Sequence, residues 1–275
     1  RHPAIDFTIY PLVYCGDLIV ATLVGMQRVT ALRAATCMAL AIACAPLAAA
    51  DEIRVAVATN FSSAMQALVA RFEETSEHTV LVSTGSTGSH YAQIKNGAPF
   101  AAFFAADEER PRLLEEEGVA VAGSRFSYAV GRLALWSTRF EYVDDAGAVL
   151  NAGDFRHLAI ANPNLAPYGA AAREVLSARG LWDALQPRIV QGQDIGQTYA
   201  FVATGNAELG FVAYSQLMSP GRDVEGSYWL VPESLHTPIA QEAVLLRDEP
   251  AARELVAFVK SPAGREIIRS FGYGP

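Results

Sequence analysis

The feature that most constrains this chain is a regular alternation of short apolar segments with helical ones, which begins at residue 53. Residues 53–58, IRVAVA, place Ile53, Val55 and Val57 on one face, which is typical of a β-strand. Residues 62–73 then carry apolar side chains at helical spacing. The same order recurs along the chain, and it predicts sheets of parallel strands with helices on both faces.

The remaining elements follow from the same reading. Further strands are predicted at 79–83, 100–106, 126–137, 158–161, 188–191, 209–214, 228–231 and 240–246. Further helices are predicted at 91–96, 108–117, 169–178, 196–204 and 251–271, several of them closed by glycine. Because no Pro- or Gly-rich linker divides the chain, we expect strands themselves to cross between two lobes.

The predicted fold class is therefore α/β with two lobes, each a mostly parallel sheet flanked by helices. We assign residues 51–130 together with 237–275 to lobe I, and residues 131–236 to lobe II. The strand at 126–137, FSYAVGRLALWS, is long enough to leave one lobe and enter the other. Hinge movement is expected near 128–133 and 228–239, and the cleft between the lobes is the default ligand site.

The first 50 residues have the pattern of a processing segment. Basic residues follow Met26, an apolar run spans 34–47, and three alanines precede Asp51. This order is typical of a signal peptide, and the run is too short and wrongly flanked for a membrane span. We interpret residues 1–25 as a start-site artefact and 26–50 as a signal peptide, which predicts export to the periplasm.

The cysteines all lie in that segment. Cys15, Cys37 and Cys44 precede Asp51, so the mature chain would hold none. Disulfide, thiolate–metal and cysteine-nucleophile chemistry are thereby excluded from the mature protein. A lipid anchor on Cys44 stays open, although Ala41 stands where such a signal prefers a larger aliphatic residue.

Four predicted strand-to-helix junctions share one chemistry. They are 58–63 (ATNFSS), 85–89 (GSTGS), 162–169 (NPNLAPYG) and 193–197 (QDIGQ). Ligands of an open α/β sheet lie beyond the carboxyl ends of its strands, where helix N-termini offer unpaired N–H groups. Together such junctions can bind a small dianion without any lysine or arginine.

Side chains at these junctions would add hydrogen-bond donors. The candidates are Thr59, Asn60, Ser86, Thr87 and Tyr168. Donors of this kind suit a fully ionised ligand and reject a protonated one, because they accept no proton from it. The alternatives are that Asn60 and Thr87 are helix N-caps and that Tyr168 is a packing residue. Four similar junctions at corresponding positions of two lobes favour the binding site.

Composition and motifs argue against other classes. A formal net charge of −8 disfavours nucleic acid and anionic membranes as partners. The sequence has no GxSxG or HExxH motif and no Walker lysine. Ser89 and His90 are neighbours at a predicted helix start, where adjacent side chains point apart, so they do not form a nucleophile–base pair. We expect His90 on the helix surface and Asp107 as the cap of the helix after it. Neither a catalytic residue nor a cofactor is predicted.

Several segments resemble the periplasmic molybdate-binding proteins of ABC transporters. They are IRVAVATNFSSAMQAL, GSTGSHYAQIKNGAPF with FFAAD after it, HLAIANPNLAPYGAAAREVL and FVKSPAGREIIRSFGY. The resemblance covers essentially all of residues 51–275, and its NGAP…AD and APYG blocks are the most telling. It implies a type II periplasmic binding protein, a molybdate or tungstate ion held by neutral hydrogen bonds in the cleft, and delivery to an inner-membrane ABC permease. We expect a monomer.

The resemblance also implies which groups bind the ion. They are Thr59, Asn60, Ser86, Thr87, Tyr168 and the backbone N–H of Ile195. Many members have serine where this chain has Asn60. Tyr214 is shifted by one residue from a tyrosine that some members use, so Tyr168 is favoured over it.

Two other ligands fit a fold of this kind. Ferric iron would need several phenolate or carboxylate ligands, and no paired tyrosines are expected near the cleft. Sulfate or phosphate would depend on the size of the pocket, which the sequence does not measure. Only the resemblance favours molybdate over these smaller tetrahedral anions.

Overall fold

The computed structural model describes residues 51–218, 220–221 and 223–274. The interpretations of residues 1–25 as a start-site artefact and 26–50 as a signal peptide, together with the anchor at Cys44, lie outside the described residues. In the described part, no helix is both long enough and apolar enough to cross a membrane.

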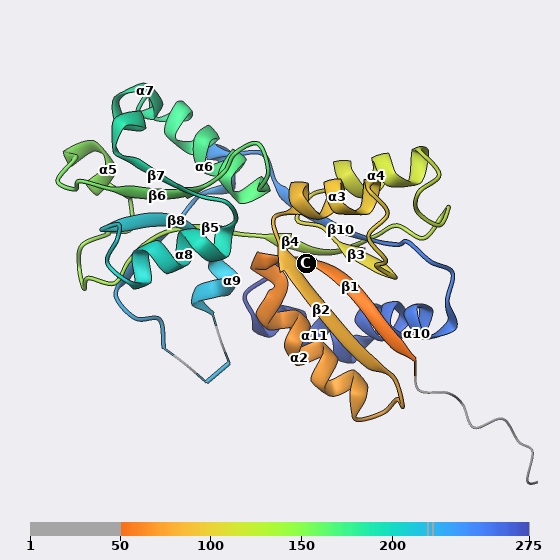
Figure 1. The fold of residues 1–275 in the computed structure, drawn as a ribbon. Helices are drawn as coiled ribbons and strands as arrows, with labels where there is room; N and C mark the ends of the chain where they lie inside the picture. The colour runs from red at the N-terminus through yellow and green to blue at the C-terminus, as the bar shows by residue number, and fades with distance from the viewer. Residues whose placement is uncertain (1–50, 219, 222, 275) are drawn as a thin grey trace, which may run out of the picture. The chain divides into compact units, whose positions relative to one another are not determined.

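The first sheet has the strand order β2-β1-β3-β10-β4 (Figure 1). These strands are β2 (Thr79–Gly85), β1 (Glu52–Ala58), β3 (Ala102–Phe104), β10 (Ile239–Leu245) and β4 (Phe126–Gly131). β1 runs parallel to β2 and β3, whereas β10 runs antiparallel to β3 and β4. A strand from the C-terminal part of the chain thus lies inside the sheet that the N-terminal part builds.

Helices cover both faces of this sheet. On one face lie α2 (Ser62–Glu73), α10 (Pro250–Lys260) and α11 (Pro262–Ser270), and their apolar residues share a core with β1. On the other lie α3 (Thr87–Lys95) and α4 (Glu109–Glu116), as Figure 1 shows. We call the sheet and these helices lobe I.

The second sheet has the order β7-β6-β8-β5-β9. Its strands are β7 (Ile189–Gly192), β6 (Leu158–Ala161), β8 (Leu209–Ala213), β5 (Leu133–Ser137) and β9 (Ser227–Leu230). β6 is parallel to β7 and β8, and β5 is antiparallel to β8 and β9. The expected two-lobed α/β fold is confirmed, but each sheet is mixed, because antiparallel pairs are as frequent as parallel ones.

The helices of lobe II also pack on both faces of their sheet. α6 (Pro167–Ala178) lies on one face, and α8 (Ile195–Ala203) and α9 (Tyr214–Leu217) lie on the other. Short helices α5 (Val149–Ala152) and α7 (Trp182–Leu185) complete the lobe. The three 3₁₀ turns in the described part of the chain are η1 (Thr59–Phe61), η2 (Gln186–Arg188) and η3 (Glu233–Leu235).

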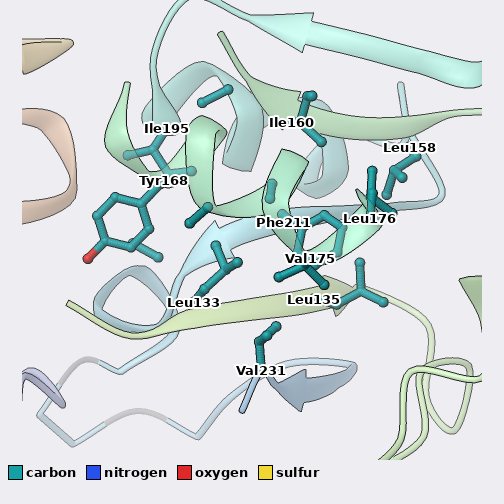
Figure 2. Packing of buried hydrophobic residues seen from close by; sticks show 14 of the residues in the cluster. Leu133, Leu135, Leu158, Ile160, Tyr168, Val175, Leu176, Ile195, Phe211 and Val231 are labelled. Atoms are coloured by element: carbon teal, nitrogen blue, oxygen red, sulfur yellow. The ribbon is translucent and has the colours of Figure 1, made fainter. Parts of the chain in front are cut away.

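The hydrophobic core beneath α6 holds the ring of Tyr168 in place. Tyr168, Val175 and Leu176 of that helix pack among Leu133 and Phe211 of the sheet (Figure 2). The ring of Tyr168 is 2% exposed, and its hydroxyl points away from the other labelled core residues. Burial of the ring therefore fixes where the hydroxyl lies.

Two predicted elements are each divided in two. The strand expected at 126–137 is β4 and β5, which belong to different sheets and are separated by Arg132. The helix expected at 251–271 is α10 and α11. Ser261 between them is extended, its Oγ accepts from Gly264 N at 3.1 Å, and Pro262 starts the new helix, because proline suits a first turn but not a helix interior.

The helix expected at 91–96 begins four residues earlier, at Thr87. The reason is Ser86, an extended N-cap residue whose side chain accepts from Ser89 N. The glycine at position 88, which the sequence placed in the junction 85–89, lies in the first turn of α3.

Candidate functional site

A small cavity lies where helix first turns from the two lobes meet. Its lining includes all of the residues that the sequence singled out: Thr59, Asn60, Ser86, Thr87, Tyr168 and Ile195. The space open to the centre of a water molecule measures about 10 Å³, which is roughly room for one water. Its lining, drawn from the described residues, includes no lysine or arginine. The structure thus brings the six together, while their role as ligands stays a prediction.

Thr59 contributes a buried hydroxyl with unused capacity. It follows β1 directly and opens η1, where the backbone turns from the strand into α2. Its Oγ1 is buried, and it has no hydrogen-bond partner among the described residues. A buried polar atom without a partner lowers the stability of the folded protein by about 1–3 kcal/mol. A hydroxyl in this state is typical of a group that hydrogen-bonds a ligand.

The start of α3 presents a second set of donors. Ser86 is the N-cap, and its Oγ accepts from Ser89 N at 3.2 Å and lies 2.6 Å from Ser89 Oγ. Thr87, which was considered as a cap, is instead the first residue of the helix. Its Oγ1 accepts from Ala106 N at 3.0 Å, so its own proton remains available for donation.

The start of α6 places a phenol at the cavity. Pro167 occupies the first turn, and no side chain caps the helix. The Tyr168 hydroxyl accepts from Gln241 Nε2 at 3.1 Å, which leaves its proton free. Burial raises the pKa of Tyr168 well above its ordinary value, so the phenol stays a neutral donor.

The start of α8 leaves one amide for a ligand. Asp194 is its N-cap, and its Oδ1 accepts from Gly196 N at 2.7 Å and from Gln197 N at 3.0 Å. The Ile195 N–H has no partner among the hydrogen bonds of residues 51–274 that the structure describes. Asp194 also lines the cavity, so the helix N-terminus has to offset the repulsion of one carboxylate.

Direct hydrogen bonds join the lobes around the cavity. Gly88 N of lobe I donates to Leu165 O of lobe II at 2.8 Å, and Ser215 Oγ donates to Asn60 O at 3.0 Å. A Cβ at position 88 would lie 3.1 Å from the Leu165 Cα and O, so a side chain there would crowd the backbone opposite. Glycine therefore permits the close approach of the two lobes.

Behind the cavity lies a buried polar network that the sequence analysis missed. Asn60 Nδ2 donates to Gln241 Oε1 at 3.0 Å and to the Tyr273 hydroxyl at 3.1 Å, so both protons of its amide are used. Tyr273 in turn donates to Asn60 O at 2.7 Å. The Tyr128 hydroxyl lies 2.9 Å from two acceptors, Gln241 Oε1 and Ala105 O. The one available signal was a glutamine at an inward position of the apolar strand β10.

This network corrects the expectation that no paired tyrosines lie near the cleft. The hydroxyls of Tyr128, Tyr168 and Tyr273 share two amide partners, Asn60 and Gln241. Burial raises the pKa of all three phenols, which disfavours the phenolates that ferric iron would need. The part of the chain that the structure describes holds no group of three or more His, Cys, Asp or Glu side chains suited to a metal.

His90 was expected on the helix surface, and that prediction is wrong. Its side chain is 1% exposed and meets the rings of Phe100 and Phe103 edge to face. The physical reason is that positions 90 and 94 share one face of α3, and this face packs against the sheet. Burial lowers the pKa of His90, and its Nε2 has no partner among the described residues.

Two further predictions concern Asp107 and Tyr214. The N-cap position of α4 is Glu108, but Asp107 just before it accepts from Arg110 N at 3.0 Å and so satisfies an amide of the first turn. Tyr214 does not line the cavity, and its ring lies under the guanidinium of Arg132.

Comparisons with known proteins identify the family. Residues 53–274 match the family described as bacterial extracellular solute-binding protein. The molybdate-binding protein ModA of Azotobacter vinelandii is 52% identical over 236 residues, which cover 85% of this chain and 93% of that protein. ModA of Rhodobacter capsulatus is 49% identical over 242 residues, covering 87% and 94%.

Solved structures place the fold. The Azotobacter vinelandii periplasmic molybdate-binding protein superposes with a TM-score of 0.79 at 41% identity, covering 81% of this chain and 99% of that one. The sulfate-binding protein SubI of Mycobacterium tuberculosis has a TM-score of 0.64 at 12% identity, covering 82% and 87%, and shows the fold alone. The chain therefore belongs to the bacterial extracellular solute-binding proteins and, within them, to the ModA family.

Proposed function

We propose that this protein is a periplasmic solute-binding protein that captures molybdate, or the similar tungstate, and delivers it to an ABC permease of the inner membrane. Relatives at 52% and 49% identity that are named molybdate-binding proteins support the choice of ion. The proposal includes export through a signal peptide at residues 26–50, a monomeric state and no cofactor.

The observation that carries the proposal is the set of uncommitted neutral donors around the cavity. They are the hydroxyls of Thr59, Thr87 and Tyr168 and the Ile195 N–H. A tetrahedral dianion accepts from several directions at once, and buried donors replace the water that it loses. Because the chain is acidic overall, attraction must come from these local dipoles rather than from its net charge of −8.

Lobe movement would admit the ion. A space with room for about one water is too small for a tetrahedral oxyanion, so binding requires the cavity walls to move apart. The segments that cross between the sheets, at Arg132 and at residues 231–238, are the natural hinges. Since both lobes would donate to the same anion, the bound ion would hold the lobes together around itself.

Isothermal titration of the purified protein with molybdate, tungstate, sulfate and phosphate tests the choice of ligand. We expect tight binding of molybdate and tungstate and weak or undetectable binding of the other two. Tight binding of sulfate or phosphate without heat from molybdate would refute the proposal and leave the alternative oxyanion. Analysis of iron in the protein as isolated tests the remaining rival.

A matched pair of tyrosine variants tests the place of binding. Tyr168→Phe removes a free phenolic proton at the cavity, whereas Tyr199→Phe alters a ring stacked on Trp136 in lobe II. The first should weaken molybdate binding by about 1–3 kcal/mol, and the second should leave it unchanged. Equal affinities of the two variants would return Tyr168 to a packing role.

A further inference from the structure

Gln241 is an unusual residue for its position. It lies in β10 on the same face as Ile239 and Ala243, and its side chain is 0% exposed. Lobe I supplies the strand, yet the side-chain amide reaches the hydroxyl of Tyr168 in lobe II. Burial of an amide costs free energy unless hydrogen bonds compensate for the lost water. The bonds that Gln241 makes are therefore the feature that distinguishes it from an apolar side chain at this position.

Its hydrogen bonds connect two of the predicted ligand residues. Nε2 donates to the Tyr168 hydroxyl at 3.1 Å, and Oε1 accepts from Asn60 Nδ2 at 3.0 Å. The Tyr128 hydroxyl lies 2.9 Å from both Oε1 and Ala105 O, and its one proton serves these two acceptors.

Tyr273 gives its own proton to Asn60 O, so it accepts from Asn60 Nδ2. The same Asn60 nitrogen then faces the oxygen of Gln241, which leaves the Gln241 nitrogen toward Tyr168.

The direction of these bonds determines where the proton of Tyr168 points. A phenol has one proton, and an oxygen that already accepts from Gln241 has to donate that proton elsewhere. We propose that Gln241 is a positioning residue, which turns the Tyr168 O–H toward the cavity and so makes it a donor to the bound oxyanion. This inference rests on the proposed function and extends it to a residue outside the ligand set.

The rest of the network holds the amide in this direction. Tyr273 accepts from Asn60 Nδ2 and donates to Asn60 O, which also accepts from Ser215 Oγ of lobe II. Asn60 is thereby restrained from both sides, and its amide protons face Gln241 and Tyr273. The arrangement joins the lobes at two points, Tyr168 and Ser215, so it is complete only when the lobes are in contact.

Gly131 leaves the space that this arrangement needs. A Cβ at that position would overlap the Tyr168 hydroxyl and lie 2.5 Å from Gln241 Nε2. Its φ is not in the left-handed region, so the demand for glycine comes from these two side chains and not from the backbone.

A double-mutant cycle tests the proposal on the full protein. Molybdate affinity is measured for the wild type, Tyr168→Phe, Gln241→Met and the double variant, with the exposed Gln66→Met as the control. We expect each single variant to bind about tenfold to a hundredfold more weakly, and the double variant to bind no more weakly than Tyr168→Phe alone. Equal losses from Gln241→Met in both backgrounds would mean a structural role and overturn the proposal.

The reverse orientation of the amide makes a different prediction. With the Gln241 oxygen on Tyr168, the phenol would donate to Gln241 and not to the ion. Tyr168→Phe would then leave molybdate affinity unchanged while Gln241→Met still lowered it. That outcome would also overturn the proposal.

Gln241→Glu preserves the shape of the side chain and makes molybdate affinity depend on pH, which a pure packing role of residue 241 would not do. An ionised carboxylate at position 241 accepts the Tyr168 proton and repels the anion, so molybdate binding should fall at least as far as in Tyr168→Phe. A protonated carboxyl donates to Tyr168 and accepts from Asn60 as the amide does. Since burial raises the pKa of a glutamate side chain, affinity should recover as the pH falls from about 9 to about 6.

The wild type supplies the baseline for this pH profile. The titratable groups around position 241 are the phenols of Tyr128, Tyr168 and Tyr273, and the Asp107 carboxyl lies beyond Tyr128. Burial raises the pKa of every one of them, so the phenols stay neutral throughout. A Gln241→Glu profile parallel to that of the wild type would count against the proposal.

The two proposals fail differently. If the wild type binds sulfate or phosphate and not molybdate, the proposed function is wrong, and the same cycle run with the bound anion still decides the role of Gln241. If the wild type binds molybdate and the cycle shows independent losses, only the inference about Gln241 is wrong.

Discussion

The front and the back of the cavity are built in different ways. The front is made of helix first turns, in which backbone amides and hydroxyls of neighbouring residues serve as donors, as at Ser86 and Ile195. The back is a network of side chains whose partners come from distant parts of the chain. Asn60 and Gln241 are 181 residues apart, and Gln241 and Tyr168 are 73 apart. The front supplies donors, and the back decides where some of them point.

This difference has an energetic side. Donors at the front include groups left without a partner, such as the Thr59 hydroxyl, which lower stability until a ligand binds. At the back, every buried side-chain nitrogen or oxygen of the described network has at least one partner, and a bonded buried network rigidifies its surroundings. Removal of a front donor that has no partner should therefore separate binding from stability, whereas changes at the back should lower both.

The largest effect is expected from Gly131→Ala, at the back. The added methyl group would overlap the Tyr168 hydroxyl and the Gln241 amide, and overpacking of this kind costs about 1–3 kcal/mol in the free energy of unfolding. Molybdate affinity should fall as well, because both groups must move. Urea unfolding and titration calorimetry measure the two losses.

Gly274→Ala is the matched control. A Cβ there would meet the Val130 Cβ at 3.4 Å, which is ordinary van der Waals contact. It should change neither quantity appreciably. A Gly131→Ala protein with wild-type affinity would show that the back of the cavity tolerates movement.

Thr59→Val, at the front, should move binding and stability in opposite directions. The substitution keeps the shape and removes a hydroxyl that has no partner in the described part of the protein. The free energy of unfolding without ligand should rise by about 1 kcal/mol, while molybdate binding weakens by about 1–3 kcal/mol. Thermal unfolding with and without molybdate measures both changes.

Thr198→Val provides the contrast. Its hydroxyl is equally buried but donates to Asp194 O at 2.9 Å, so the variant should lose stability. If Thr59→Val also lost stability and retained its affinity for molybdate, the Thr59 hydroxyl would have a structural role and would not bind the ion.

The same division explains what the sequence could predict. Strands such as β1 and β6 and the junctions at Thr59 and Ile195 follow from local periodicity and capping chemistry, which short windows carry. The start of α3 was missed because Gly88 suggested a loop. That glycine is required by the Leu165 carbonyl, a contact between the lobes.

Gln241 was missed for a related reason. The sequence around Gln241 does not reveal whether its side chain is buried and hydrogen-bonded or faces solvent. Its partners come from α6, η1 and β4, which are distant in the sequence. His90 was misplaced because its aromatic partners, Phe100 and Phe103, lie outside its own helix. Long-range contacts decide both positions, and a single sequence does not display them.

A matched pair of caps sharpens the description of the front. Ser86 caps α3 beside the cavity, and Ser261 caps α11 far from it in the sequence, each accepting from an amide three residues on at 3.2 and 3.1 Å. Replacement of either serine by alanine should lower the free energy of unfolding by about 0.5–2 kcal/mol. Only Ser86→Ala should also weaken molybdate binding. Equal molybdate affinities of the two variants would mean that Ser86 acts as a helix cap and does not bind the ion.

The smallest effect is expected from His90, which does not line the cavity but packs against Gly85, a residue of its lining. Its Nε2 faces Gly85, its Nδ1 lies 3.4 Å from Gln93 Oε1, and carbonyls of Val57 and Ser83 and the Asp194 carboxylate lie nearby. Burial nonetheless lowers its pKa below the ordinary 6.5, so the folded state binds a proton less readily than the unfolded state.

The sign of the pH effect follows from that difference. The contribution of His90 to stability is complete above pH 6.5 and declines as the pH falls toward the folded pKa, by at most about 1.4 kcal/mol per pH unit. In His90→Phe this part of the decline should disappear. Urea unfolding of both proteins at pH 8 and pH 5.5 measures it, and equal slopes would mean that the imidazole takes up its proton inside the folded protein at no cost.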